Sequence, residues 1–198
     1  MDTRLSNPAS QADWWLSPWP GTEAGLLLGL AAVLLREGWI DREFLSRWVN
    51  WEEFLGDRDY LQDMARRGLI AAVPEGRGFD DFVALLGALY APHTPEWVEQ
   101  ECGVRAAVVE EVAAEIHRAG HSFATNVWRS AAAGHLGGWM VARALLFLNV
   151  LVGAIGEPGG VLPAGWCKFV PRPPPRRRPF APGTSCTSRA ATRWPTWR

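Results

Sequence analysis

One short stretch of this sequence has the residue types and spacing of a ligand-binding helix start. Pro20-Gly21-Thr22-Glu23 precedes an apolar run, residues 24–36, that is predicted to form a buried helix. The free N–H groups and positive dipole end of a helix can hold an anion or a heterocycle, and the Glu23 carboxylate can accept from a guanine-like donor edge. The same residues also suit an ordinary N-terminal cap, so both interpretations stay open.

A second stretch combines polar side chains with small residues. Asn126-Val127-Trp128-Arg129-Ser130 is followed by three alanines and Gly134. The arginine and the polar side chains offer hydrogen bonds, and the small residues after them would let a bulky ligand lie against the backbone. The alternative is a loop whose arginine is held by an ion pair.

Other residue types that do chemistry are sparse and badly spaced for it. Four histidines are present, and no two of them form a metal-binding pair within one helix: His93, His117, His121 and His135. Three cysteines lie far apart without a C-x-x-C pair: Cys102, Cys167 and Cys186. The sequence also lacks a Walker loop and a G-x-S-x-G elbow. From these residues alone we predict no metal centre, no disulfide framework and no nucleophilic site.

The formal charge of −1 is a cancellation between two parts of the chain. Residues 172–198 hold seven arginines and no acid, whereas residues 1–171 carry 13 basic and 21 acidic groups, a net charge of −8. A nucleic-acid surface needs clustered basic residues, and the single lysine is Lys168. Nucleic acid is therefore not expected as a partner of residues 1–171.

The apolar segments are too short to span a membrane. The two longest runs, residues 24–35 and 144–156, each reach roughly 20 Å as helices, against ~30 Å for the hydrocarbon core of a bilayer. The first residues lack the apolar region of a signal peptide, so the chain as written is expected in the cytoplasm.

Periodicity and cap residues predict a mostly helical chain with few short strands, of the α/β class. Helices are expected at residues 24–36, 41–55, 80–89, 94–103, 104–118 and 139–152, which makes residues 94–120 a small helical pair. The β-branched and aromatic residues of Ser122–Trp128 predict a buried strand, and residues 12–19 a short extended segment. The charged, glycine-spaced residues 56–78 carry no predicted element.

Four motifs, taken in order, resemble successive segments of the molybdopterin oxidoreductases of the dimethyl sulfoxide reductase type. They are D-x-R at residues 2–4, P-G-T-E at 20–23, Y-A-P-H-T-P-E at 90–96 and L-x-G-x-x-G-x-P-G-G at 151–160. The ordered set carries the resemblance, which extends from residue 1 to about residue 171 and makes residues 1–171 a partial domain of this family.

The resemblance implies a predominantly helical fragment of a Rossmann-like domain that holds one half of a bis(molybdopterin guanine dinucleotide) cofactor with molybdenum. Asp2 and Arg4 would lie near the guanosine, and Gly21, Thr22 and Glu23 would contact the guanine or its ribose. Four residues of the second stretch would approach the pterin or the metal pocket: Asn126, Trp128, Arg129 and Ser130. Two positions depart from the family pattern: Thr3 replaces a proline and loosens the turn, while Glu23 replaces the commoner aspartate and keeps the acceptor.

Several parts of the family pattern are missing from this sequence. They are the cysteine cluster for an iron–sulfur centre, the molybdenum-coordinating residue, the strand before Asp2 and the carboxy-terminal domain that encloses the cofactor. The resemblance thus implies a fragment of the catalytic subunit of a molybdenum oxidoreductase, inactive alone. The intact relative would carry out two-electron redox chemistry and electron transfer. Its partners would be the remaining domains and an iron–sulfur electron-transfer subunit, in the cytoplasm, the periplasm or a membrane-associated complex.

Residues 172–198 are rich in proline and arginine without periodicity, which predicts disorder. Read from the third base of each codon, their codons permit the string W-N-x-L-H-F-P, and the family continues with similar text after a proline-rich segment. We interpret this tail as the product of a frameshift near residues 172–175.

An alternative function comes from the tryptophans. The chain has 12 of them, several crowded into its first quarter. An exposed tryptophan face would suit a stand-alone helical protein-interaction module, although apolar patches also mark contacts with domains that are missing. Both functions stay open on the sequence.

Overall fold

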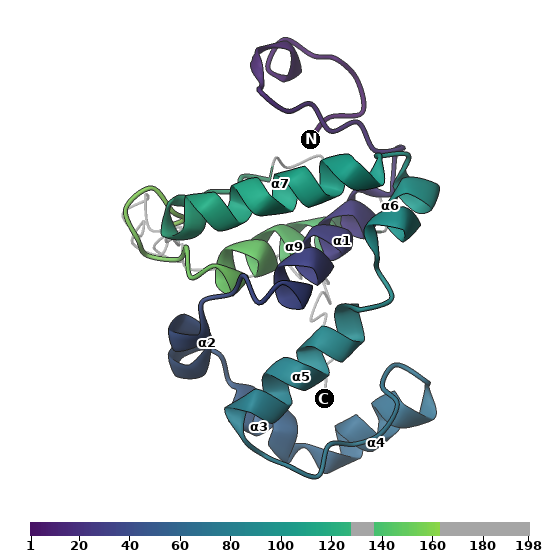
Figure 1. Ribbon diagram of the computed structural model, residues 1–198, viewed down its shortest axis with the longest axis vertical. Coiled ribbons are helices and arrows are strands. Elements are labelled where there is room, and N and C mark those ends of the chain that lie inside the picture. Colours follow the sequence, from purple (N-terminus) through teal and green to yellow (C-terminus); the bar gives the residue numbers. More distant parts are fainter. Residues whose placement is uncertain (128–136, 163–198) are drawn as a thin grey trace, which may run out of the picture. The chain divides into compact units, whose positions relative to one another are not determined.

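The computed structural model describes residues 1–127 and 137–162, which form helices and loops (Figure 1). The 3₁₀ turns are η1 (Ala9–Gln11) and η2 (Gly120–Ser122). The α-helices are α1 (Glu23–Arg36), α2 (Arg42–Trp48), α3 (Trp51–Gly56), α4 (Arg58–Arg66), α5 (Phe79–Tyr90), α6 (Pro95–Cys102), α7 (Ala106–Ala119) and α9 (Gly138–Leu151). A mostly helical chain was predicted, and the described residues are mostly helical. The tail, residues 172–198, lies outside them.

The strand predicted at Ser122–Trp128 is wrong for the residues that are described. Ser122 ends η2, and residues 123–127 follow without regular structure. Phe123, Thr125 and Val127 are partly buried and the residues between them are exposed, so the alternation typical of a strand is real. No neighbouring strand pairs with it, because the only β pairing in the described chain is an isolated bridge between Ile155 and Val161. The predicted α/β class is accordingly not seen in these residues.

Helix α1 lies at the centre of the larger core and packs against α5, α6, α7 and α9 (Figure 1). Its apolar side chains point in nearly every direction, and eight of its 14 residues are buried. A helix that is apolar all round is stable in water only when neighbours cover it. The prediction of a buried helix is confirmed.

Glycines allow the close approach of α1 to α6. A Cβ added at Gly29 would overlap Cγ2 of Val98, and a Cβ at Gly25 would lie 3.1 Å from Sγ of Cys102.

The carboxy-terminal end of α1 is followed by Gly38, whose φ of +68° suits the left-handed position after a helix. Arg36, in the last turn, forms an ion pair with Glu110 of α7, in which its Nη2 atom donates to both carboxylate oxygens at 2.8 and 2.9 Å.

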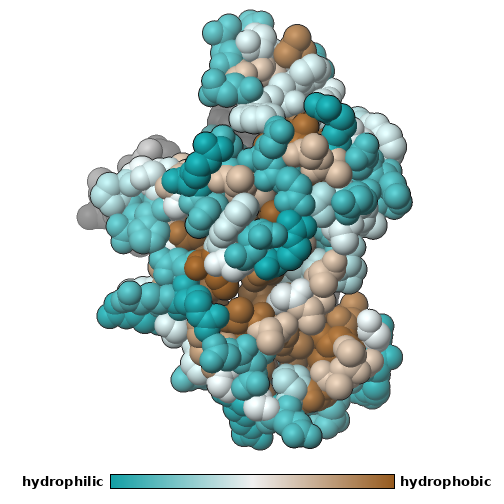
Figure 2. Space-filling view, in the orientation of Figure 1, coloured by the Kyte–Doolittle hydropathy of each residue, from teal (hydrophilic) through white to brown (hydrophobic). Residues whose placement is uncertain are grey.

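A smaller core joins α3, α4 and α5. Its buried residues are Leu55, Leu61, Met64, Ile70, Phe82 and Leu85. Helix α4 was not predicted, because the charged and glycine-spaced residues around it hide its short apolar face. Its local signals are nevertheless present: the Asp57 side chain accepts from the Tyr60 N–H at 3.0 Å, and Leu61 and Met64 are buried three residues apart. Figure 2 shows apolar side chains gathered over α5 on this face of the molecule.

The pair α6 and α7 begins and ends where the residue types predict. The Thr94 side chain accepts from the Trp97 N–H at 3.2 Å, Pro95 is the first residue of α6, and Gly103 ends this helix with a φ of +75°. Helix α7 ends at Gly120, which also has a positive φ.

None of the described helices is both long and apolar enough to cross a bilayer.

Candidate ligand-binding site

The start of α1 leaves its first N–H groups without a side-chain cap. The chain turns at Gly21, which has a φ of +90°. Thr22 occupies the capping position, but its hydroxyl donates to the Trp19 carbonyl at 2.8 Å and accepts nothing from the helix. The capping bond expected of Thr22 is therefore absent. Among the described residues no side-chain acceptor caps the first turn of α1, which carries the positive end of the helix dipole.

Glu23, the first residue of α1, carries an acceptor without a donor. Its Oε2 atom is buried and has no hydrogen-bond partner among the described residues. Burying a carboxylate oxygen without a donor is costly, and most buried polar atoms in proteins are paired. Among the described residues this oxygen is thus an acceptor without a donor.

The turn before α1 is held against the end of α6. The Trp19 N–H donates to the Cys102 carbonyl at 2.9 Å, and the Cys102 thiol donates to the Thr22 carbonyl at 3.4 Å. A Cβ at Gly103 would lie 2.7 Å from the Trp19 indole nitrogen, so glycine is needed for this contact. Sequence reasoning missed this role of α6, because nothing local links Cys102 and Gly103 to a turn 80 residues earlier.

Cys102 serves packing and not nucleophilic chemistry. Its side chain is fully buried. Burial raises the pKa of the Cys102 thiol above its ordinary value, and the hydrogen bond to Thr22 offsets only part of that effect. A thiol that stays protonated is a weak nucleophile.

Asp2 and Arg4 lie in a separate loop near the N-terminus. The Asp2 carboxylate accepts from the Ser6 hydroxyl at 2.6 Å and from the Arg4 N–H at 3.2 Å, and these bonds lower the pKa of Asp2. The Trp15 indole donates to the Asp2 carbonyl at 2.9 Å, and the Asp2 N–H donates to the Leu16 carbonyl at 3.0 Å. Arg4 is exposed. The loop is thus tied to the segment that leads into α1.

Asn126 is the one described residue of the second predicted stretch that was assigned to the site. It is exposed, and it follows an extended segment that packs against α9. Trp128, Arg129 and Ser130 lie outside the described residues. Within the described part, no hydrogen bond or ion pair joins the Asp2 loop, the α1 start and Asn126 to one another.

The described residues offer no alternative metal site. Residues 1–127 and 137–162 contain no group of three or more His, Cys, Asp or Glu side chains that could hold a metal ion. His117 stacks on Trp39 with ring centroids 4.8 Å apart, and His121 pairs with Asp41 at 2.6 Å. Two apolar hollows of about 420 and 450 Å³ are lined mainly by residues of α9 and α2, and none of the predicted site residues lines them.

Sequence comparison relates the chain to known enzymes. It is 29% identical to dimethyl sulfoxide reductase DmsA of Escherichia coli over 162 residues, which cover 81% of this chain and 18% of that protein. It is 29% identical to biotin sulfoxide reductase of Cereibacter sphaeroides over 155 residues, 78% of this chain and 17% of that protein. No protein-family model matches the chain.

Structure comparison gives a likeness in fold. Acetylene hydratase from Pelobacter acetylenicus aligns with a TM-score of 0.55 and 23% sequence identity, covering 77% of this chain and 16% of that chain.

These comparisons confirm the resemblance to molybdopterin oxidoreductases of the dimethyl sulfoxide reductase type. The similarity runs through most of the chain and is not confined to the motifs. The chain spans about a fifth of the length of the curated relatives it matches.

Proposed function

We propose that this chain is part of the catalytic subunit of a molybdenum-dependent oxidoreductase and that the start of α1 binds the guanine end of molybdopterin guanine dinucleotide. The observation that supports this most directly is the buried Oε2 atom of Glu23, to which no described residue donates a hydrogen bond, beside a helix start without a side-chain cap. Guanine presents two adjacent N–H donors on one edge, which is the complement of a carboxylate.

The described residues fit such a ligand in complementary ways. Glu23 would accept from the guanine edge, and the free N–H groups of the first turn of α1 would donate to ribose or phosphate oxygens. Gly21 has no side chain to obstruct the approach, and a Cβ added there would meet nothing within 4 Å. Asp2 and Arg4 would border the guanosine. Asn126, with Trp128, Arg129 and Ser130 beyond the described part, would face the pterin.

Molybdenum held by the pterin would supply two-electron redox chemistry, and this chain would supply binding and orientation. We propose that the remaining cofactor contacts, the metal ligand and an iron–sulfur centre come from further domains and from an electron-transfer subunit. The helices would then be one part of a Rossmann-like cofactor domain, and this chain alone would be inactive.

Nucleotide selectivity tests the proposal. Isothermal titration of the chain with GDP and with ADP is expected to show binding of GDP and little binding of ADP, because adenine lacks the N–H edge that faces Glu23. Glu23→Gln removes the charge and brings its own donor toward the guanine, so its affinity for GDP is expected to fall by about tenfold or more. Glu111→Gln, on the exposed face of α7, is the matched control and keeps wild-type affinity. Equal binding of GDP and ADP, or no loss in Glu23→Gln, contradicts the proposal.

A second candidate function is a stand-alone helical interaction module. It is favoured by the exposure of large apolar side chains, with Trp48 75% exposed and Trp139 54% exposed. Such side chains are typical of protein contacts, and an interaction module would need neither Glu23 nor the α1 start. A chain that is folded and monodisperse but binds neither GDP nor ADP would support this second candidate.

A further inference from the structure

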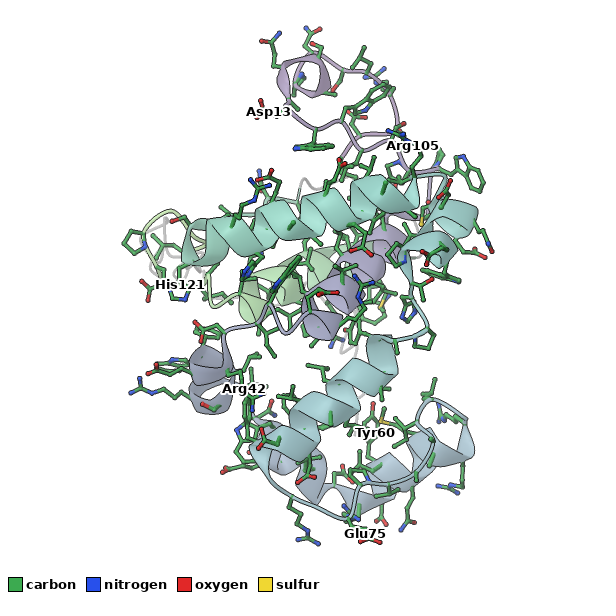
Figure 3. All side chains as sticks on the ribbon, viewed as in Figure 1. Asp13, Arg42, Tyr60, Glu75, Arg105 and His121 are labelled. Carbon is green, nitrogen blue, oxygen red and sulfur yellow. The ribbon has the colours of Figure 1, made fainter. Side chains whose placement is uncertain are left out.

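The segment His121–Thr125 leads directly to Asn126 and is held by residues that lie far from it in the sequence. These residues are Asp41, Asn149 and the turn Gly153–Gly160, which carries the glycines of the motif at residues 151–160. Figure 3 shows His121 at the end of α7 opposite to Arg105. No strand among the described residues pairs with this segment. Contacts from three places in the chain hold it in position instead.

Asn149 makes the most specific of these contacts. It lies in the apolar helix α9 and is fully buried. Its amide nitrogen donates to the Thr125 hydroxyl at 2.5 Å and to the Leu145 carbonyl at 2.8 Å, while its Oδ1 atom is buried without a partner among the residues that the structure describes. Burying an amide in an apolar helix is unfavourable unless its polar atoms form hydrogen bonds. The bond to Thr125 joins residues 24 apart in the sequence, so it links α9 to the segment before Asn126.

The glycine motif brings a second support against the same segment. A Cβ at Gly160 would overlap the Ala154 carbonyl and lie 2.8 Å from the His121 carbonyl, and a Cβ at Gly159 would lie 3.1 Å from Cβ of Ser122. The Ser122 hydroxyl also donates to the Pro158 carbonyl at 3.4 Å. The two glycines therefore act by letting the turn touch residues 121–122.

Asp41 supplies the third support. Its carboxylate pairs with His121 Nε2 at 2.6 Å and also caps α2 by accepting from the Phe44 N–H at 2.8 Å. A Cβ at Gly153 would lie 2.5 Å from Oδ2 of Asp41, so the first glycine of the motif makes room for this carboxylate. The motif thus contributes to two of the three supports.

We propose that Asn149 and the turn Gly153–Gly160 are positioning residues: they aim the segment His121–Thr125 so that Asn126 faces the pterin end of the cofactor. This inference rests on the proposed function. It assigns the glycine motif to the support of a ligand-facing segment and not to direct contact with phosphate or pterin.

The test compares two probes that share one end. GDP reports on the α1 start alone, whereas molybdopterin guanine dinucleotide released from a purified molybdenum enzyme also reaches the segment that Thr125 orients. Thr125→Val keeps the shape of the side chain but removes the hydroxyl that Asn149 contacts, and Thr125→Ser keeps the hydroxyl. We expect Thr125→Val to weaken binding of the dinucleotide cofactor at least fivefold and to leave GDP binding unchanged, with Thr125→Ser close to wild type.

A second variant covers the glycine turn. Gly160→Ala is expected to show the same split between the two probes, together with faster hydrogen exchange of the amides at residues 121–126. Unchanged binding of the dinucleotide by both Thr125→Val and Gly160→Ala overturns the inference, as does an equal loss for both probes, which would indicate general destabilisation. If the wild-type chain binds neither probe, the proposed function itself fails.

Discussion

Glu23 and Asn149 each bury an oxygen atom that no donor of the described chain reaches. The two oxygens have different surroundings. Glu23 stands at an uncapped helix start, where a ligand can supply donors, whereas Asn149 is enclosed in an apolar helix and uses its other side-chain atom to hold Thr125. In our proposals the first oxygen accepts from a ligand, and the second belongs to a residue that supports the segment before Asn126.

At the residue scale, the sequence predicts the backbone conformation of glycines better than the hydrogen-bond partners of hydroxyl groups. Gly21, Gly38 and Gly103 all adopt the positive φ that their place at a turn or helix end predicts. Thr22 was expected to cap α1, but its hydroxyl donates backward to Trp19. A threonine offers both a donor and acceptors, so the sequence fixes its place at the helix start but not the direction of its bond.

The Asp41–His121 pair predicts how stability depends on pH. Burial alone would raise the pKa of the Asp41 carboxyl, but the bonds from the Phe44 N–H and from His121 outweigh it and hold the pKa below its ordinary value of 3.8. The unfolded chain therefore takes up a proton at this position before the folded chain does. The stabilisation from Asp41 is complete above the ordinary pKa and is lost as the pH falls through the lower, folded value.

Urea unfolding of wild type and Asp41→Asn from pH 7 to pH 3 measures this contribution. The asparagine can still cap α2, so the folded chain is retained while the charge is removed. We expect Asp41→Asn to be less stable at pH 7 and the difference to shrink below about pH 4. Asp59→Asn, an exposed position in α4, serves as the control. A difference that stays constant across this range would contradict the assignment.

At the scale of elements, helices were predicted where one face is strongly apolar and were missed where charge dominates. Helix α1 has an apolar surface all round, and its place at the core follows from that alone. Helix α4 buries Leu61 and Met64 between charged residues, so its apolar face is too short to stand out. The strand at Ser122–Trp128 was predicted from its β-branched and aromatic residues, but a strand needs a partner, and the partner depends on tertiary structure.

A pair of glycine substitutions tests the packing of α1 against α6. Gly29→Ala would place a methyl group on Val98, so we expect it to destabilise the chain by about 1 to 2 kcal/mol after the gain in helix propensity is subtracted. Gly87→Ala, in α5, meets nothing within 4 Å and should stabilise the chain by about 0.5 to 1 kcal/mol. The free energy of unfolding in urea measures both changes.

The opposite signs make this pair informative. Both substitutions add one methyl group inside a helix, so a difference between them reports the space around each glycine and not helix propensity. If Gly29→Ala stabilised the chain as much as Gly87→Ala, the close approach of α1 to α6 would be wrong.

At the scale of the whole molecule, two observations agree: large apolar side chains are exposed on α9, and the chain aligns with only part of the length of its relatives. Trp139, Met140 and Leu146 are all at least 40% exposed on α9, whose other face packs against α1. A helix that is apolar all round is expected to be covered on both faces. The chain aligns with only 18% of the length of dimethyl sulfoxide reductase DmsA, so further domains of such a subunit would provide the cover.

The charge of the chain is distributed unevenly between residues 1–171 and the tail, residues 172–198. The seven arginines of residues 172–198 account for the difference between the near-neutral total and the acidic residues 1–171. We propose that they arise from a frameshift. In the third-base frame, Gly183 and Thr184 permit tryptophan and asparagine, and Cys186 to Arg189 permit L-H-F-P, which together give the family-like W-N-x-L-H-F-P. At each of the six specified positions, the family-like residue is one of two or more residues that the third base of the preceding codon permits, so the DNA sequence decides whether the match is real.

Resequencing the DNA across the codons for residues 165–198 and its flanks decides the matter. We expect one inserted or deleted base near residues 172–175, an open frame that continues with W-N-x-L-H-F-P, and an upstream frame that encodes a cysteine cluster. Those results would make the arginine tail irrelevant to function and would support the catalytic-subunit proposal. An intact frame with intergenic sequence on both sides would instead show that the tail is native. It would favour the interaction module, because the exposed apolar side chains of α9 would then be free to contact a partner protein.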